Sequence, residues 1–354
     1  MKYPLHVIIR KKISSILNGI LALFSPKKNK QTTLNKNEIK TILIIRPNYR
    51  IGNLIFLTPL INELSKQIPD AKIDIIVGMR LAGKIIEPLP NVDKVIDIPR
   101  KLLLQPLEML RYIKQTRQKN YDLALNMSGG STSSQIVSAL IKAKYKASFY
   151  SDKMWGNFTH IQVRGNKHYR HMGLESLEFL RFFDLPFPDS QPTLDIKLTE
   201  DELSEAKKDL DNLLQQNNIS GDKKIITLFR NARFDKKIED TWWSKWIDEI
   251  LRLDSNIVFI DILSPDIPEK LSDKVLAYGN KNLRVLGAFF KHCDLYVSAD
   301  TGPMHLAVAS QAKVLAFFNK TNAEVYGALG EGNKTIDVEN LSIEEVAKIT
   351  REFL

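Results

Sequence analysis

The stretch DLYVSADTGPMHLAVAS, residues 294–310, joins a strand pattern to a helix pattern within a few positions. The apolar run at 295–297 is typical of a buried strand, and the alanine-rich residues that follow are typical of a helix. Pro303 suits the first helical position, where its missing N–H would be unpaired anyway, and Gly302 permits close approach of a backbone or a ligand. The stretch therefore predicts a strand, a turn and a helix, and the turn is either an ordinary capped turn or the mouth of a site.

The turn also contains the groups of an anion site. The N–H groups of Met304 and His305, together with the helix dipole, would favour a pyrophosphate. Asp300 offers a carboxylate to sugar hydroxyls. A satisfied turn with a good helix cap explains the same spacing equally well.

Strand and helix patterns alternate along most of the chain from Thr41 onward, beginning with the strand TILIIR and a helical pattern over 51–68. This alternation predicts an α/β chain with parallel sheets covered by helices on both faces. A proline-rich break at 185–192 and a charged helix at 199–217 separate two similar halves. The predicted divisions are a tail at 1–40, a domain at 41–190, a linker helix at 191–222, a domain at 223–340 and a final helix at 341–354. With two doubly wound domains, ligands are expected in the cleft between them.

The net charge of +10 comes mainly from the tail. Residues 1–40 contain nine lysines and arginines and one acid, so the body is almost neutral and a nucleic-acid partner is not expected. Apolar residues recur at helical spacing in 1–25, and Arg10, Lys11 and Lys12 interrupt them, which argues against a transmembrane span. We expect a basic amphipathic helix on an anionic membrane surface, or else a helix packed on the protein itself or on a partner.

Two other groups of residues are interpreted as structural. The single cysteine, Cys293, excludes an internal disulfide, fits a reducing compartment and precedes a buried strand, which favours a core position. His168 and His171 have a spacing that suits a metal on a helix, but no third ligand is evident, so no metal site is predicted.

A second strand end opens another candidate site, RPNYRIGNLIFLTP at 46–59. Gly52 suits close backbone approach, and Arg46 or Arg50 could face an anion. The single glycine does not match a dinucleotide-binding fingerprint, which needs three. A third strand end, NMSGGSTSS, makes Ser128 and Gly129 either a ligand-binding loop or an ordinary turn.

Together, the early motif RPNYRIGNLIFLTP and the late motif DTGPMHLA resemble glycosyltransferase family 9, the heptosyltransferases. The resemblance extends over 41–335. It implies a GT-B architecture of two Rossmann-like domains facing a cleft, with the acceptor on the N-terminal domain and the nucleotide sugar on the C-terminal one. It also implies inverting transfer, typically from ADP-heptose and without a metal or other cofactor.

The resemblance assigns roles to individual residues. The donor's diphosphate and sugar would be held by the late motif, which comprises Asp300, Thr301, Gly302, Pro303, Met304 and His305. A lysine ahead of Trp242, either Lys236 or Lys237, would neutralise charge on the leaving diphosphate. The acceptor side would contain Arg46, Arg50, Gly52, Asn53, Ser128 and Gly129.

One residue departs from the family pattern. The glycine is usually followed by an aspartate that serves as general base, and this chain has Asn53 there. An amide cannot accept a proton at neutral pH, so Asn53 can only orient or hydrogen-bond. Asp300, His171 and Asp122 are candidate substitutes.

The sequence therefore predicts a cytoplasmic, membrane-associated inverting glycosyltransferase. The expected reaction transfers a sugar, heptose from ADP-heptose, to a lipid-linked saccharide in lipopolysaccharide assembly. One alternative is transfer from another nucleotide sugar in O-antigen or capsule assembly. Another is a protein that binds nucleotide sugars and has lost the base.

Overall fold

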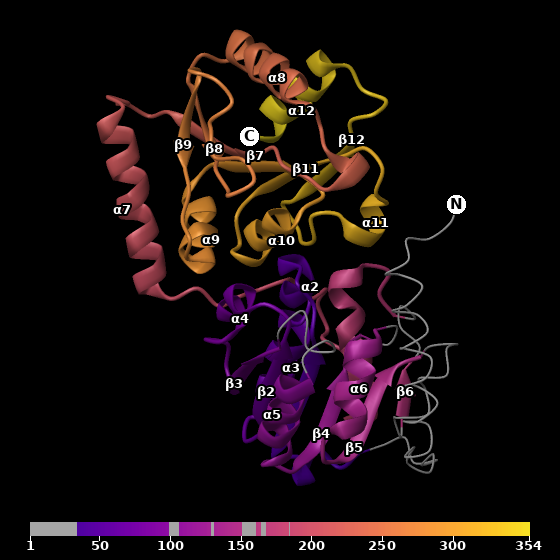
Figure 1. Cartoon of the computed structure of the whole chain (residues 1–354). Coiled ribbons are helices and arrows are strands. Elements are labelled where there is room, and N and C mark those ends of the chain that lie inside the picture. The colour runs from indigo at the N-terminus through magenta and orange to yellow at the C-terminus, as the bar shows by residue number, and fades with distance from the viewer. Residues whose placement is uncertain (1–33, 99–105, 129–130, 151–160, 164–167, 184) are drawn as a thin grey trace. The chain divides into compact units, whose positions relative to one another are not determined.

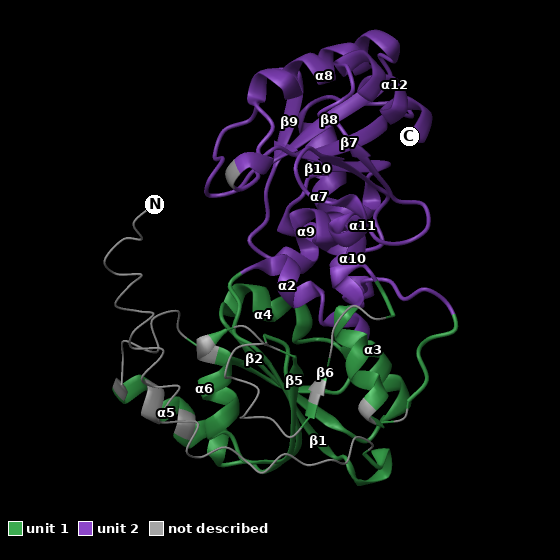
Figure 2. Ribbon diagram, turned by 90° about the vertical axis from the view of Figure 1, so that its right-hand side faces the viewer, with its two compact units in different colours: residues 1–49, 60–169, 175–189 green, residues 50–59, 170–174, 190–354 purple. Residues whose placement is uncertain are grey.

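The structure, a computed structural model, describes residues 34–98, 106–128, 131–150, 161–163, 168–183 and 185–354. The predicted amphipathic helix of the tail lies outside the described residues. The chain forms two compact units, coloured separately in Figure 2. The first unit comprises 1–49, 60–169 and 175–189, and the second comprises 50–59, 170–174 and 190–354.

The first unit is built on a six-stranded parallel sheet in the order β3-β2-β1-β4-β5-β6. The strands are β1 (Thr41–Arg46), β2 (Lys72–Val77), β3 (Val92–Asp97), β4 (Tyr121–Asn126), β5 (Ala143–Phe149) and β6 (Ile161–Val163). The helices are η1 (Lys36–Glu38), most of α3 (Thr58–Gln67), α4 (Arg80–Ile86), α5 (Pro106–Arg117), α6 (Thr132–Leu140) and most of η4 (Met172–Phe183). This strand order is that of a doubly wound dinucleotide-binding fold.

The second unit repeats the same order, β12-β11-β10-β7-β8-β9, in a second parallel sheet (Figure 1). The strands are β7 (Lys224–Phe229), β8 (Ile257–Ile262), β9 (Val275–Tyr278), β10 (Leu295–Ala299), β11 (Val314–Phe318) and β12 (Lys334–Asp337). The helices are α2 (Ile51–Ile55), α7 (Glu200–Gln216), η5 (Phe234–Lys236), α8 (Asp240–Leu253), α9 (Leu283–His292), α10 (Gly302–Ala309), α11 (Ala323–Tyr326) and α12 (Ile343–Phe353). The predicted α/β class with two doubly wound sheets is confirmed, whereas the cleft between the domains stays a prediction.

Continuous apolar strands explain why both sheets are parallel and covered. Every residue of β10 is buried, as are 42–45 of β1, and such runs are typical of strands with helices on both faces. In the second unit, Trp243 and Trp246 of α8 are fully buried against Phe317 of β11. Cys293 is also buried, as expected for a core residue.

The contacts divide the chain differently from the predicted domains. Residues 50–59 and 170–174 belong to the second unit, although the prediction placed them in a domain at 41–190. The helix α7 is likewise part of the second unit, because Arg284 of α9 forms an ion pair with Glu202 of α7 and donates to the Ile196 carbonyl at 2.7 Å. Packing between distant segments, which local patterns do not report, determines these memberships.

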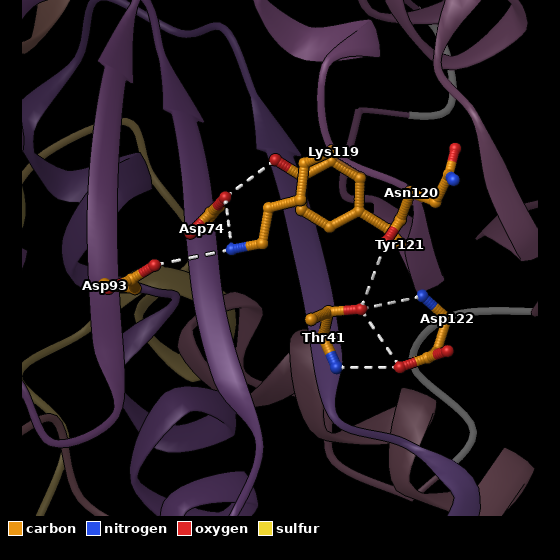
Figure 3. A network of polar contacts seen from close by, with 7 residues as sticks. All are labelled: Thr41, Asp74, Asp93, Lys119, Asn120, Tyr121 and Asp122. Carbon is orange, nitrogen blue, oxygen red and sulfur yellow. Dashed lines mark hydrogen bonds and ion pairs between the residues drawn. The ribbon is translucent and has the colours of Figure 1, made fainter.

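A polar network closes the amino end of the first sheet (Figure 3). The buried carboxylate of Asp74 accepts hydrogen bonds from the Tyr121 hydroxyl at 2.7 Å and from Lys119 at 3.0 Å, and Lys119 also reaches Asp93 at 3.4 Å. Burial, followed by the bond to Asp74, raises the pKa of Tyr121 well above its usual value. The network ties β2, β3 and β4 together where no ligand is expected.

Among the described helices, none is both long enough and apolar enough to pass through a bilayer.

Candidate active site

The strand order places a switch point in each sheet, and the predicted site residues lie at these two points. In the second sheet the direction of winding reverses between β7 and β10, and in the first it reverses between β1 and β4. In doubly wound folds, ligands bind outside the carboxyl ends of the strands at such points. Asp300 directly follows β10, and Arg46 ends β1.

An ion pair occupies the switch point of the second sheet. The Nζ atom of Lys236 contacts Oδ2 of Asp300, whose side chain is 9% exposed against 35% for the lysine. Lys237 is exposed. Of the two lysines left open by the sequence, Lys236 is therefore the one that lies beside Asp300, because η5 turns its side chain toward the end of β10.

The amino end of α10 is capped by Thr301, whose Oγ1 accepts the Met304 N–H at 3.3 Å. The His305 N–H donates to the Thr301 carbonyl at 3.5 Å. The prediction that both amides are free for an anion is therefore wrong, since the Thr301 hydroxyl accepts the first and the Thr301 carbonyl accepts the second. Gly302 is the first helical residue and Pro303 the second.

Two glycines bring the two motifs into direct contact within the second unit. A Cβ atom on Gly52 would lie 2.8 Å from Cδ2 of His305, and one on Gly302 would lie 3.3 Å from Cβ of Ile51. Both positions therefore exclude side chains so that α2 can pack on the start of α10. The close approach predicted at Gly52 is made by the protein's own His305.

Three rings pack behind this contact. Phe56 meets His305 edge-on, with ring centroids 4.6 Å apart, and meets His171 at 6.1 Å. Burial lowers the pKa of His305 well below its ordinary value, despite the opposing charge of Asp300. Burial also lowers the pKa of His171. Both histidines are therefore neutral at pH 7.

The hydrogen bonds of His171 remove it as a candidate base. Its Nδ1 accepts the Gly173 N–H at 3.0 Å, so its Nε2 carries the hydrogen and donates to the Gly327 carbonyl at 3.0 Å. No ring lone pair is left for a substrate proton. His168, the other member of the histidine pair, stacks on Phe187 with ring centroids 4.2 Å apart. In the part of the chain that the structure describes, no cluster of three His, Cys, Asp or Glu residues suits a metal ion.

Asp122 is also wrong as a candidate base, because it lies near the amino end of β4. Its Oδ2 accepts the Thr41 N–H at 2.9 Å and the Thr41 hydroxyl at 3.0 Å (Figure 3). It also accepts the Lys40 N–H at 2.9 Å. Burial alone would raise the pKa of Asp122, but these bonds outweigh it and the pKa is lowered. The carboxylate joins β1 to β4 at the end of the sheet opposite to the switch point.

Three residues predicted for the acceptor side, Arg50, Gly52 and Asn53, lie in the second unit with the donor motif. Arg50 is exposed, and Asn53 is partly exposed on α2. The Asn53 backbone N–H donates to the Arg50 carbonyl at 3.1 Å. The structure therefore groups the position of the missing carboxylate with Asp300 and His305.

The other acceptor-side residues lie at the switch point of the first sheet. The Arg46 guanidinium donates to the Met127 carbonyl, which joins the ends of β1 and β4. Ser128 follows, with its N–H bonded to Oδ1 of Asn126 at 3.0 Å. Gly129 lies outside the described residues. Burial lowers the pKa of Arg46, and Glu175 opposes that effect.

Sequence reasoning missed two charged groups at these strand ends. Arg230 directly follows β7 and binds Asp261 at 2.9 Å and Asp240 at 2.7 Å. The position of Arg230 directly after the strand KIITLF is the feature of the sequence that could have identified it as a site residue. Burial raises the pKa of Glu175, and the charge of Arg46 opposes that rise. The sequence could not indicate this interaction, because Arg46 lies far from Glu175 along the chain.

Comparisons with known proteins find relatives that are similar in sequence. The chain is 24% identical over 289 residues to lipopolysaccharide heptosyltransferase 3 of Escherichia coli K12, covering 77% of this chain and 80% of that protein. It is 25% identical over 322 residues to lipopolysaccharide heptosyltransferase 1 of Campylobacter coli, covering 84% and 89%.

Solved structures share the fold. A family 9 glycosyltransferase from Veillonella parvula superposes with a TM-score of 0.70 at 17% identity, covering 93% of this chain and 92% of that one. The E. coli heptosyltransferase WaaC with ADP gives 0.70 at 18% identity, covering 88% and 100%. The family model for glycosyltransferase family 9 (heptosyltransferase) matches residues 109–352. With two doubly wound sheets and a model match over more than half of its length, this chain belongs to glycosyltransferase family 9 and is a glycosyltransferase of the GT-B fold.

Proposed function

We propose that the enzyme transfers heptose from ADP-heptose to a lipid-linked saccharide in lipopolysaccharide assembly, with inversion at the transferred carbon. The curated relatives are lipopolysaccharide heptosyltransferases, and WaaC structures contain ADP or ADP-2-deoxy-2-fluoro heptose. The observation that carries the proposal is the Lys236–Asp300 pair, which follows two adjacent strands at the switch point of the second sheet.

The donor would bind at this pair. Asp300 would accept hydrogen bonds from sugar hydroxyls, and Lys236 would turn from the carboxylate toward the diphosphate. A positive group aimed at the leaving diphosphate stabilises the charge that develops there. The dipole of α10, which begins at Gly302, acts in the same direction. With these groups available, the proposed mechanism uses no metal.

The acceptor hydroxyl must approach opposite the leaving diphosphate, because inversion is an in-line displacement. Asn53 would orient that hydroxyl through its amide and cannot take its proton. His171 has no free lone pair, and Asp122 lies at the wrong end of its sheet. Asp300 is then the one of the three substitutes that remains at the site, where it lies on the donor side beside Lys236.

The asparagine at position 53 also favours the two alternatives to this function. One is transfer from another nucleotide sugar, and the other is a protein that binds nucleotide sugars without transferring the sugar. A thermal-shift series with ADP-, UDP- and GDP-sugars separates the donors, because a ligand at 100 times its Kd adds about 2.7 kcal/mol to folded-state stability. A shift with ADP-sugars alone supports ADP-heptose. A shift with UDP- or GDP-sugars alone contradicts it.

Turnover separates the enzyme from a protein that only binds. Release of ADP in the presence of a lipopolysaccharide-core acceptor supports transfer, and the anomeric configuration of the product, read by NMR, tests inversion. Asn53→Asp restores the usual family carboxylate. A large gain in activity would indicate that a base has been lost at position 53, and unchanged activity would point to a base elsewhere.

We further propose that the enzyme is cytoplasmic and that residues 1–25 bind an anionic membrane surface, because most of the net charge lies in the tail. Deletion of residues 1–36 is expected to weaken sedimentation with anionic vesicles. Unchanged affinity would contradict this role for the tail.

A further inference from the structure

Arg230 directly follows β7 at the carboxyl edge of the second sheet, and its buried guanidinium binds three partners. Its Nε donates to Asp261 of β8 at 2.9 Å, and its Nη1 donates to Asp240 at 2.7 Å. Its Nη2 donates to the Glu269 carbonyl. The guanidinium therefore connects the end of β7, the end of β8, the start of α8 and the loop that follows β8.

The bond to Asp261 fixes the guanidinium in the core. Asp261 is fully buried on β8, which lies beside β7 (Figure 1) and pairs Asp261 with Leu228. Its Oδ2 accepts the Arg230 Nε–H and the Leu271 N–H, both at 2.9 Å. Because the guanidinium is planar and its donors have fixed directions, this anchor also sets where its other donors point.

The bond to Asp240 joins the two ends of a loop. Asp240 is the first residue of α8, so its pair with Arg230 closes the segment 231–239, which contains η5 and Lys236. The Asp240 side chain is 48% exposed, whereas that of Asp261 is fully buried. The pair with Asp240 is therefore not needed to satisfy a buried acid, and its structural effect is the closure of the loop.

Lys236 lies between two anchored neighbours within this loop. The Asn319 side chain, which follows β11, donates to the Asp235 carbonyl at 3.2 Å, and Ile238 is buried in the core of the second unit. The Lys236 side chain is 35% exposed and contacts Asp300. The backbone of Lys236 therefore depends on the closure of the loop, while its side chain has room to turn.

We propose that Arg230 is a positioning residue for the donor, because its pair with Asp240 keeps the loop 231–239 closed and Lys236 at the position of the diphosphate. The inference rests on the proposed function, in which the Lys236 side chain leaves Asp300 for the diphosphate while its backbone stays in place. A misplacement of about 1 Å that originates far from the chemistry can cost about 100-fold in rate. An arginine that only joined β7 to β8 would not need Asp240.

Asp240→Asn opens the loop and leaves the buried pair of Arg230 with Asp261 intact. Substitution of Arg230 itself would leave a buried carboxylate without its partner and so threatens the fold. The matched control is Glu239→Gln, which removes one exposed negative charge from the same end of α8 without touching the Arg230 pair. All variants are made in the full chain.

The test is a double-mutant cycle on ADP binding, with Asp240→Asn, Lys236→Met and their combination. By isothermal titration calorimetry, Asp240→Asn alone is expected to raise the Kd of ADP about tenfold. In the Lys236→Met background the same substitution is expected to change the Kd by less than about twofold, because its effect is exerted through Lys236. Glu239→Gln is expected to stay within about twofold of wild type.

Three results of the cycle would overturn the inference. One is an unchanged Kd in Asp240→Asn. Another is an equal effect of Asp240→Asn in both backgrounds, since general damage to the site adds to the loss of Lys236. The third is a tenfold change in Glu239→Gln, which would assign the effect to charge at the start of α8.

A second measurement decides the closure without any ligand. Arg233 and Lys237 are exposed and lie within the loop, so trypsin can cleave there if the loop opens. Asp240→Asn is expected to be cleaved within 231–239 several times faster than wild type and Glu239→Gln, as read by mass spectrometry. Equal rates for Asp240→Asn and wild type would overturn the closure.

These measurements also separate the inference from the proposed function. A wild type that binds neither ADP nor an ADP-sugar would refute the proposed function, while trypsin cleavage would still decide whether Arg230 and Asp240 close the loop. Wild-type binding of ADP with additive effects in the cycle would refute the positioning role of Arg230 alone.

Discussion

At Gly52 the sequence indicates the kind of contact but not the group that makes it. The sequence predicts a close approach at this position, and the structure supplies one, but the neighbour is the ring of His305. The pairing of Gly52 with Gly302 explains why both motifs contain a glycine at these points. A ligand is not required to account for either.

Gly52→Ala is expected to lower the free energy of unfolding by about 1–3 kcal/mol, because the new Cβ would lie 2.8 Å from Cδ2 of His305 and must displace the ring or α2. Urea denaturation measures the loss. Gly279→Ala, whose Cβ would meet nothing closer than 3.4 Å, is the matched control. Equal effects of the two substitutions would contradict the packing described for α2.

Lys236→Met is expected to lower kcat/KM about 100-fold, because it removes the cation paired with Asp300 at the proposed diphosphate position. Steady-state kinetics with varied donor measure the change. Lys237→Met removes an exposed lysine next in sequence and is expected to leave kcat/KM within about twofold. A larger loss at 237 than at 236 would reverse the assignment of the two lysines.

At the scale of elements, the strands could be predicted well, because buried parallel strands are uninterrupted apolar runs bounded by turns. The bounds of helices are harder to predict where a proline or a competing side chain interrupts the helical pattern. The pattern over 51–68 predicts one helix, yet α2 ends at Ile55 and α3 begins at Thr58. Pro59 lacks the N–H that would donate to Ile55, so the helix is interrupted there. Likewise, the sequence places His168 and His171 on a helix, whereas the structure has a 3₁₀ helix from Met172 to Phe183, and both histidines precede it.

The attachment of α7 to α9 depends on Arg284, which is 4% exposed in its side chain and pairs with Glu202. Arg284 also donates to the carbonyls of Ile196 and Lys197, at 2.7 and 2.8 Å. Arg284→Met is expected to cost about 3 kcal/mol of unfolding free energy, because a half-buried carboxylate loses its partner. Arg252→Met, which breaks the exposed pair with Glu249, is expected to cost less than about 1 kcal/mol in the same denaturation experiment.

The same pair makes stability depend on pH. Burial alone would raise the pKa of Glu202, but Arg284 and Thr199 outweigh it, so the folded-state pKa lies below the ordinary value of 4.5. Its contribution is therefore complete above that value and declines as the pH falls through the folded-state pKa. Wild type is expected to lose more stability than Glu202→Gln between pH 6 and pH 3 in denaturant titrations. Parallel curves for the two proteins would contradict a lowered pKa.

At the scale of the molecule, the family and the two doubly wound sheets could be predicted from strand alternation and two motifs. The sequence could not predict that 50–59 and 170–174 belong to the second unit, because this membership depends on contacts between residues more than a hundred positions apart. Local patterns report which face of an element is apolar but not which distant surface covers it.

Binding of the donor is expected to show directly which segments belong to the second unit. A ligand that binds one folded unit stabilises all of its segments, by about 2.7 kcal/mol at 100 times Kd. Amide hydrogen exchange with ADP is therefore expected to slow in 50–59 and 170–174 together with β7, β10 and α10. The strands of the first sheet serve as the internal control. Protection confined to 190–354 would contradict the division of the chain.

The contact between Gly52 and His305 also has a consequence for synthesis on the ribosome. At roughly 5–20 residues per second, translation needs about 13–50 s to proceed from the first of these residues to the second. For that interval α2 has been made but its binding surface on α10 has not. The apolar side chains of Leu54, Ile55 and Phe56, which are buried in the finished protein, form an early segment that a nascent-chain chaperone can bind. The second unit is thus completed only when one of the earliest helices of the chain joins one of the latest.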